Sequence, residues 1–364
     1  MATFDIVFEG GGAKGSVFVG AMESLLSRGH KYRRLVGTSA GAITATLVAA
    51  GYGPQEMLAA VNEHLPDGKP RFSEFMDPPP VGDFSTSQIT QSETAAVLHA
   101  VALPGMVDNL ILYELLKNKI YRQMFCLVEC GGIFAGDKFY AWIVEKLKAK
   151  GMADDLTLKA FFDKTGTDLS LVASDTSHME MLVLNHRTAP DCPVAWAVRM
   201  SMSIPFVWKE VIWEPAWKLY RGRDKAGNSI VDGGVLSNFP IRLIDIQPAA
   251  DPEIREIMGD TDADAALNLG MLIDTNVPVP GSPPKQQSAS PIGHLRILRR
   301  IERLFDTMMS ARNNDEIRSH KEEVCHLPAK GYGTMEFDMD QDRLDDLIKA
   351  GRDAMDAHLL SRGY

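Results

Sequence analysis

The order strand, glycine-rich turn, helix and second strand opens this chain and restricts its fold more than any other feature. Residues 4–8 are strand-like and apolar apart from Asp5, and the glycine-rich run 10–15 follows them at once. Residues 17–26 carry apolar side chains at helical spacing, and residues 34–36 form a second short strand. A strand–helix–strand order predicts two parallel strands joined by a right-handed crossover. The chain is therefore expected to be an α/β protein.

The second strand runs into the sequence Gly37-Thr38-Ser39-Ala40-Gly41, and residues 40–50 continue as a helix. This G-x-S-x-G spacing is typical of a nucleophile elbow, a sharp turn that exposes a serine between a strand and a helix. Gly37 and Gly41 would relieve the crowding that such a turn imposes. The N-terminus of the helix would stabilise negative charge at Ser39. The alternative is a serine that only caps the helix.

The glycine-rich run reads Gly10-Gly11-Gly12-Ala13-Lys14-Gly15, which fits the dinucleotide pattern G-x-G-x-x-G. A dinucleotide site also requires an acidic residue at the end of the second strand, where this chain has Ser39. The run is not a Walker A loop, because no lysine follows Gly15. The remaining interpretation is a turn whose backbone N–H groups hold an oxyanion at the start of a helix. Lys14 would either add positive potential there or be a solvated surface lysine.

A third short motif, Asp232-Gly233-Gly234, follows the strand-like pair 230–231. Asp-Gly is also an ordinary turn dipeptide. Close to Ser39, however, the carboxylate of Asp232 could accept the proton of the serine hydroxyl. A nest of N–H donors, a serine and a base are the components of acyl transfer. The three motifs in this order therefore predict a serine acyl hydrolase.

Two alternatives remain open on the residues alone. An α/β-hydrolase triad would use a histidine that follows Asp232, and the candidates are His294, His320, His326 and His358. That fold usually places its elbow after several strands, whereas Ser39 follows the second strand. The other alternative is a lipid- or nucleotide-binding module without turnover.

The three motifs together resemble those of the patatin-like phospholipases, which include plant patatins, the catalytic domains of cytosolic phospholipase A2 and bacterial effector lipases. The family motif G-G-G-x-[KR]-G is matched by Gly10–Gly15. The motif D-G-G/A is matched by Asp232–Gly234, and Asn238 stands where the family usually has an asparagine. A block of small residues before a proline reads 200–205 here, with bulkier side chains than usual. The resemblance covers about residues 4–245.

This resemblance implies a three-layer α/β/α fold with a central, largely parallel sheet. It also implies hydrolysis of fatty acyl esters of phospholipids or lysophospholipids by a Ser39–Asp232 dyad. Gly10, Gly11 and Gly12 would supply the oxyanion hole, supported by motif residues Lys14, Gly15, Gly37, Gly41, Gly233 and Gly234. No metal or cofactor is implied. Some family members require an activator protein or small nucleotide, and this sequence does not identify one.

Three regions outside the motifs complete the expected single catalytic domain, residues 1–364. Residues 55–135 are mostly helical in pattern, and their apolar surface predicts either core helices or a cap over an acyl-chain site. Residues 278–291 are rich in Pro, Ser and Gln and are expected to form a flexible loop. Residues 292–364 follow as a helical C-terminal part.

The C-terminal part contains an apolar stripe flanked by Arg296, Arg299, Arg300 and Arg303. A basic amphipathic helix of this kind either lies on an anionic membrane or packs against the core with a solvated arginine face. Peripheral contact with membranes is therefore one expectation for this chain.

Composition narrows the partners and the location. The 364 residues include 45% hydrophobic and 24% charged residues, as in soluble globular proteins. The net charge of −10, from 38 basic and 48 acidic residues, argues against general nucleic-acid binding. Residues 35–55 form the longest uncharged stretch, but their Gly, Ser and Thr content favours a buried elbow and helix over a membrane span. No signal-peptide pattern is present and the four cysteines lack metal-binding spacing, so we expect a cytoplasmic location, or export without a classical signal.

Overall fold

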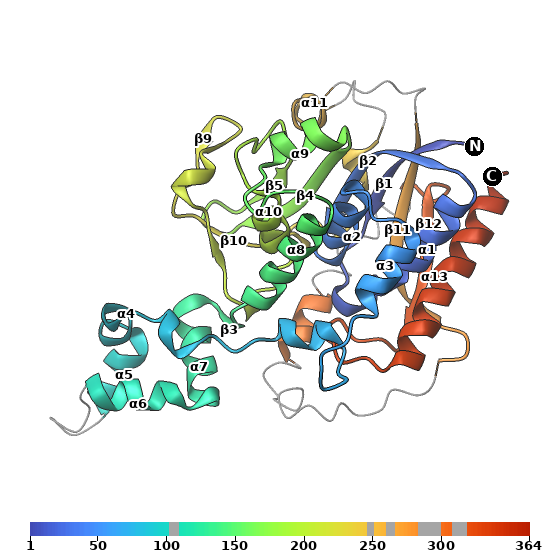
Figure 1. Ribbon diagram of the computed structural model, residues 1–364. Coiled ribbons are helices and arrows are strands. Elements are labelled where there is room, and N and C mark those ends of the chain that lie inside the picture. Colours follow the sequence, from blue (N-terminus) through green and yellow to red (C-terminus); the bar gives the residue numbers. More distant parts are fainter. Residues whose placement is uncertain (102–108, 246–250, 260–265, 283–299, 308–318) are drawn as a thin grey trace.

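The computed structural model describes residues 1–101, 109–245, 251–259, 266–282, 300–307 and 319–364 (Figure 1). Its main sheet has eight strands within these ranges: β1 (Thr3–Phe8), β2 (Lys31–Thr38), β4 (Asp168–Asp175), β5 (Glu180–Leu184), β7 (Val211–Ile212), β10 (Ser229–Asp232), β11 (Leu267–Pro278) and β12 (Val324–Lys330). The strand order is β12-β11-β1-β2-β4-β10-β7, and β5 pairs with β4. The N-terminal unit therefore forms the middle of the sheet.

The centre of the sheet is parallel, as the sequence predicts. β1 runs parallel to β2 and β11, β2 runs parallel to β4, and β11 runs parallel to β12. The remaining strands of the sheet are antiparallel, since β10 pairs with β4 and β7 in that direction and β5 returns along β4 in a hairpin. The two motif strands β2 and β10 thus pair with successive residues along one edge of β4, and β5 occupies the opposite edge.

Helices cover both faces of the sheet, which makes the three layers of the expected α/β/α fold. They are α1 (Val17–Ser27), α2 (Ala40–Ala49), α3 (Pro54–Val61), α8 (Asp137–Ala149), α9 (Leu158–Thr165), α10 (Val194–Ser201), α11 (Pro252–Met258) and α13 (Gln341–Ser361). Phe4, Ile6 and Phe8 of β1 belong to the larger core cluster, together with residues of α1, α2 and α13. Val7 points to the opposite face and clusters with residues of 239–258.

Close contact between α1 and α13 joins the two ends of the chain. A side chain on Gly20 would overlap the carbonyl group of Ile348, and one on Gly351 would overlap the carbonyl of Val17. The helices can therefore approach at backbone distance only because each carries a glycine at the crossing.

Two small two-stranded sheets are separate from the main sheet. In one, β3 (Gly132–Phe134) is parallel to β6 (Phe206–Trp208), and in the other, β8 (Leu219–Tyr220) is antiparallel to β9 (Arg223–Asp224).

Four helices form an extension of the main body: α4 (Thr86–Thr90), α5 (Glu93–Val101), α6 (Asn109–Lys117) and α7 (Lys119–Cys130). In Figure 1 they lie beyond β3, away from the main sheet. They bury a small cluster of their own, which includes Phe84, Leu116 and Phe125. In contrast, α3 and the turn η2 (Arg71–Phe75) pack on the main core. The region 55–135 is therefore two structures rather than one.

The predicted loop 278–291 and the predicted basic helix each include residues that the structure does not describe. Most of the predicted loop 278–291 lies outside the described residues, and Pro278 is the last residue of β11. Of the predicted basic helix, residues 300–307 are helical and bury Phe305, whereas Arg296 and Arg299 lie outside the described ranges. The uncharged stretch 35–55 forms the end of β2, the elbow and the buried helix α2. Within the described ranges, no helix combines the length and apolar character needed to cross a bilayer.

Candidate active site

Ser39 occupies a strained turn between β2 and α2. Its backbone angles are φ 54° and ψ −120°, a conformation that residues with a side chain rarely adopt. A side chain on Gly37 would overlap the carbonyl of Gly41, and one on Gly41 would overlap the carbonyl of Phe8. The turn therefore requires glycine at both positions, and its geometry is that of the predicted nucleophile elbow.

Hydrogen bonds fix the backbone of Ser39 on both sides. Its carbonyl accepts the N–H of Ala42 at 2.9 Å, which begins α2. Its N–H donates to Oγ of Ser201 at 3.0 Å, and the Ser201 hydroxyl donates to the carbonyl of Val172 at 2.6 Å. Ser39 is 3% exposed, so the turn is held inside the protein with only its edge open to the cavity described below.

Asp232 is the last residue of β10 and is completely buried. Its Oδ1 accepts the N–H of Gly234 at 2.7 Å, and its own N–H donates to the carbonyl of Ser203 at 2.9 Å. Oδ2 is buried and has no hydrogen-bond partner among the described residues. The free oxygen is the one that remains available for the hydroxyl of Ser39.

Burial raises the pKa of Asp232 to about 7, because the charged carboxylate is removed from water. Interactions with the Ser39 hydroxyl and the Gly234 N–H act in the opposite direction and lower that pKa. Oδ2 itself has no hydrogen-bond partner among the described residues. A carboxyl group with a pKa near neutrality suits proton transfer at physiological pH.

Sheet register brings the second and third motifs together. Thr38, which precedes the serine, lies opposite Val172 of β4. Asp232 lies opposite Ala173, the next residue of the same strand. Since β2 and β10 pair with adjoining residues on the same edge of β4, Ser39 and Asp232 lie where the two strands meet.

The glycine loop lies next to this pair, and its backbone N–H groups differ in their hydrogen bonding. The N–H of Gly10 donates to the carbonyl of Asn238 at 3.0 Å, so this donor is already used and is not free to bind an oxyanion. The N–H groups of Gly11 and Gly12 have no hydrogen-bond partner among the described residues. Gly12 has φ 57° and borders the same cavity as Ser39. Of the three glycines, Gly11 and Gly12 therefore keep N–H groups at this loop that are unpaired within the described ranges.

Lys14 is buried, so the alternative of a solvated surface lysine is wrong. Its side chain is 9% exposed, and its Nζ lies 3.8 Å from Oδ1 of Asp306. Gly15 allows the glycine loop to pack closely against α2, because a Cβ on Gly15 would lie 2.5 Å from Cβ of Ala40. The turn η1 (Gly12–Ser16) thus rests directly on the N-terminus of α2.

Glu9, immediately before the glycine loop, is a buried carboxyl group that sequence reasoning did not single out. Its Oε2 accepts the N–H of Ile273 at 2.6 Å, and its Oε1 accepts Nδ2 of Asn238 at 3.0 Å. Burial raises the pKa of Glu9 to about 8, and the positive charge of Lys14 opposes this shift. The signal in the sequence was an acidic residue between an apolar strand and a glycine-rich turn.

The two glycines after Asp232 also allow close approach. A side chain on Gly233 would overlap the carbonyl of Val172 on β4. A Cβ on Gly234 would lie 3.3 Å from Cζ of Phe305, which belongs to the helical segment 300–307. This part of the predicted amphipathic helix therefore packs beside the third motif, which its own pattern did not indicate.

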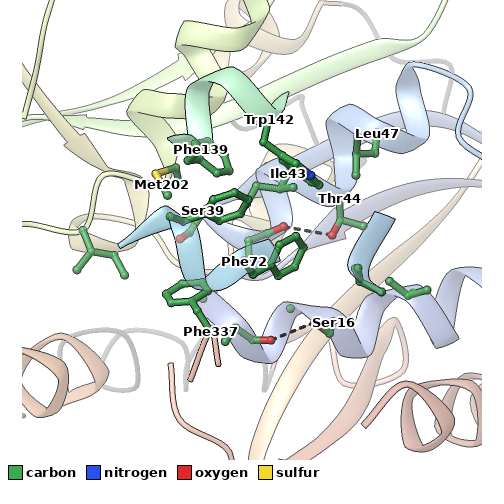
Figure 2. A pocket seen from close by; sticks show the side chains of 18 of the residues that line it. Ser16, Ser39, Ile43, Thr44, Leu47, Phe72, Phe139, Trp142, Met202 and Phe337 are labelled. Carbon is green, nitrogen blue, oxygen red and sulfur yellow. Dashed lines mark hydrogen bonds between the residues drawn. The ribbon is translucent and has the colours of Figure 1, made fainter. Parts of the chain in front are cut away.

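Ser39 borders an apolar cavity of about 730 Å³, including its open mouth. It follows one side of α2, past Ile43, Thr44 and Leu47, and aromatic side chains from η2 and α8 form the facing wall (Figure 2). These are Phe72, Phe75, Phe139 and Trp142. The described residues that line the cavity carry no charge. The cavity can therefore hold a hydrocarbon chain with one end at the serine.

The segment that carries Phe72 and Phe75 is tied to α8 by polar contacts. Nε1 of Trp142 donates to Glu63 at 3.1 Å, and Arg71 binds Glu145 at 2.6 Å. Met57, Val61, Phe72 and Phe75 line the cavity, whereas no lining residue comes from the described part of the helical extension.

The late histidines do not complete a triad in the described ranges. His320 binds Asp245 at 3.3 Å, and His326 binds Asp274 at 2.8 Å. His358 belongs to the C-terminal helix α13, and partial burial lowers the pKa of its imidazole to about 4. His294 lies outside the described residues. Within the described ranges, no group of His, Cys, Asp and Glu side chains has the arrangement of a metal site.

The chain is similar in sequence to a bacterial protein and to a viral protein. It is 29% identical over 355 residues to the uncharacterized protein YqhO of Bacillus subtilis, covering 96% of this chain and 95% of YqhO. It is 21% identical over 238 residues to the probable lipid hydrolase 463L of Invertebrate iridescent virus 6, covering 65% of this chain and 62% of the viral protein.

Solved structures of two bacterial proteins are also similar. VipD from Legionella pneumophila aligns with a TM-score of 0.48 and 16% identity, covering 99% of this chain and 67% of VipD. The type III effector ExoU of Pseudomonas aeruginosa aligns with a TM-score of 0.44 and 17% identity, covering 99% of this chain and 53% of ExoU.

The match to a protein family identifies the chain. The family described as patatin-like phospholipase matches residues 6–245, which include all three motifs and the strands that carry them. Membership of this family supports a lipid hydrolase activity. The chain belongs to the patatin-like phospholipase family.

Proposed function

We propose that this protein hydrolyses fatty acyl esters of phospholipids or lysophospholipids, with Ser39 as nucleophile and Asp232 as base. One observation carries the proposal. A buried carboxyl group with an unpartnered oxygen faces a strained serine at the end of an uncharged apolar cavity. Similarity to a probable lipid hydrolase supports the same substrate class.

The reaction would proceed in two acyl transfers. Asp232 accepts the hydroxyl proton while Oγ of Ser39 bonds to the acyl carbonyl carbon, and the carbonyl oxygen becomes an oxyanion. The N–H groups of Gly11 and Gly12 stabilise that charge. The proton then passes from Asp232 to the departing alcohol, which leaves an acyl-serine. Water gives a proton to Asp232, its oxygen bonds to the acyl carbon, and the fatty acid leaves as the proton returns to Ser39.

The cavity suggests how the acyl chain lies. Ser39 and Leu47 stand about two helical turns apart on α2, roughly 12 Å at the rise of an α-helix. A chain that enters with its carbonyl at Ser39 would therefore run along Ile43 and Thr44 toward Leu47. Because the lining is uncharged, the polar head group would remain outside.

The helical extension supports contact with a lipid surface. Apolar side chains are exposed on three of its helices: Val97, Ile111, Tyr113, Leu115, Ile120 and Val128. Exposed apolar groups on one extension are typical of an interaction surface. Flotation with vesicles of phosphatidylcholine tests this part of the proposal. Replacement of Ile111 and Ile120 by serine should reduce vesicle binding without changing turnover of a soluble ester.

The activity itself is tested with purified protein and its Ser39→Ala variant. Each would be incubated with a short-chain ester and with phosphatidylcholine vesicles, and fatty acid release would be measured. The proposal predicts release by the wild-type protein and none above background with Ser39→Ala. Equal release by the two proteins would exclude Ser39 as the nucleophile.

A further inference from the structure

The turn that ends α10 contacts the backbone of both proposed catalytic residues. Oγ of Ser201 accepts the N–H of Ser39 at 3.0 Å. Two residues later, the carbonyl of Ser203 accepts the N–H of Asp232 at 2.9 Å. A single turn of chain therefore lies between the nucleophile and the base and binds each of them. This turn falls in the sequence block 200–205, to which the mechanism assigns no function.

The hydroxyl of Ser201 works as acceptor and donor at once. It accepts from Ser39 and donates to the carbonyl of Val172 at 2.6 Å. Ser201 is completely buried, so water cannot replace either bond. Loss of the hydroxyl would leave one buried N–H and one buried carbonyl without partners, and buried groups without partners destabilise the local structure.

The bond to Ser201 acts on the strained side of the elbow. The carbonyl of Ser39 is held by the first turn of α2, but its N–H is held by Ser201. A backbone with φ 54° and ψ −120° persists only where the surroundings hold it in place. Without the bond, the peptide between Thr38 and Ser39 can rotate, and Oγ moves with it.

Val172 extends the connection to the base. Its carbonyl accepts from Ser201 and lies against Gly233, where any side chain would overlap it. The same residue pairs with Thr38 in the sheet. A shift of Ser201 would therefore change the position of the elbow relative to the Asp232 loop.

We propose that Ser201 is a positioning residue that sets the separation of the Ser39 hydroxyl and the Asp232 carboxylate. This inference rests on the proposed function of that pair. Ser201 does not contact substrate, and it acts through the backbone of Ser39. Its effect should therefore appear in the chemical step and not in substrate binding.

Ser170 provides a matched control. It is also a completely buried serine, on β4, and its Oγ accepts Nδ2 of Asn185 at 3.1 Å. Removal of its hydroxyl takes one of two hydrogen bonds from Nδ2 of Asn185, which has no hydrogen bond to Ser39 or Asp232. A merely structural effect of a lost buried serine would appear in both variants.

The experiment compares wild-type protein, Ser201→Ala, Ser201→Cys and Ser170→Ala on a short-chain ester. A displacement of about 1 Å in an active site can lower the rate roughly 100-fold, so kcat of Ser201→Ala should fall by roughly 10- to 100-fold with KM nearly unchanged. Ser201→Cys should be intermediate, because a thiol donates and accepts only weakly. Ser170→Ala should keep kcat, whatever its loss of thermal stability. An unchanged kcat in Ser201→Ala, or an equal loss in Ser170→Ala, would overturn the inference.

Hydrogen–deuterium exchange of the elbow peptide, residues 36–44, separates this inference from the proposed function. Ser201→Ala should speed exchange in that peptide, and Ser170→Ala should not. If wild-type protein shows no Ser39-dependent turnover, the proposed function fails, and the exchange result alone decides whether Ser201 holds the elbow. Unchanged exchange in Ser201→Ala would then contradict the inference.

Discussion

Gly10 and Asn238 hold each other through two hydrogen bonds. The N–H of Gly10 donates to the carbonyl of Asn238 at 3.0 Å, and Nδ2 of Asn238 donates to the carbonyl of Gly10 at 3.1 Å. The same Nδ2 also donates to Glu9 at 3.0 Å. The asparagine that follows the Asp232 motif thus fixes the glycine loop of the first motif. Two motifs far apart in the sequence act as one unit at the site.

Asn238→Ala should therefore lower kcat strongly while the protein stays folded. The glycine loop would lose its clamp, and the free N–H groups of Gly11 and Gly12 would no longer be held toward the oxyanion. Removal of one oxyanion donor typically costs roughly 10²–10³ in rate, and loss of the clamp should approach the lower end of that range. Steady-state kinetics on a short-chain ester measure the change.

Asn185→Ala is the control for this variant. Asn185 is equally buried, and its Nδ2 donates to Ser170 and to the carbonyl of Ile257, outside the site. It should lose stability but keep kcat. If Asn238→Ala retained the kcat of Asn185→Ala, the clamp would have no part in the reaction.

The rate should rise with pH through about 7. Asp232 accepts a proton only in its ionised form, and burial raises the pKa of this carboxyl to about 7. The profile of kcat/KM against pH reports this ionisation in the free enzyme. Glu9→Gln removes a second buried carboxyl group, beside the glycine loop, whose pKa is raised to about 8, and should leave the inflection near 7 in place. An inflection that disappears in Glu9→Gln would assign it to Glu9 instead.

Asp232→Asn should increase the free energy of unfolding, and more so at pH 8 than at pH 5. The folded-state pKa of Asp232 lies above its unfolded value of 3.8, so the stability linked to its proton is present at low pH. That stability is lost as pH rises from about 4 to about 7, because the unfolded carboxyl ionises first. Asparagine does not ionise and avoids this loss. Thermal unfolding at the two pH values measures the difference, and an equal effect at both would contradict the raised pKa.

The length of the preferred acyl chain should depend on Leu47. This side chain is 4% exposed and borders the cavity about two helical turns from Ser39. Leu47→Trp should lower kcat/KM for a palmitoyl ester by roughly 10-fold or more, because excess volume in a packed site is costly, and leave a butyryl ester unchanged. Leu47→Ala should shift the ratio of the two values in the opposite direction. Parallel losses on both esters would place the chain elsewhere.

Much of the centre of the fold could be predicted because its signals are local. The strand before Gly10, the elbow at Ser39 and the helix after it each carry their pattern in a few adjacent residues. The positions that require glycine, such as Gly37 and Gly41, are visible in the sequence for the same reason. In the structure, a side chain at either glycine would overlap neighbouring backbone atoms, which explains why both positions have none.

The rest depends on contacts between distant segments. The hydrogen bond from the N–H of Gly10 to the carbonyl of Asn238 cannot be predicted from either motif alone. Phe305 reaches Gly234 from the C-terminal part, and Phe72 reaches the cavity from a turn that has no periodic pattern. The role of Ser201 depends on a hydrogen bond to the elbow, which the small-residue block before Pro205 gave no reason to expect.

Covalent labelling tests the central claim most directly. Wild-type protein would be treated with a fluorophosphonate, digested and examined by mass spectrometry, beside Ser39→Ala and Asp232→Asn. We predict one adduct, on Ser39, which is absent in Ser39→Ala and formed much more slowly in Asp232→Asn. An adduct on another residue of the wild-type protein, or labelling of Asp232→Asn at the wild-type rate, would contradict a Ser39–Asp232 dyad.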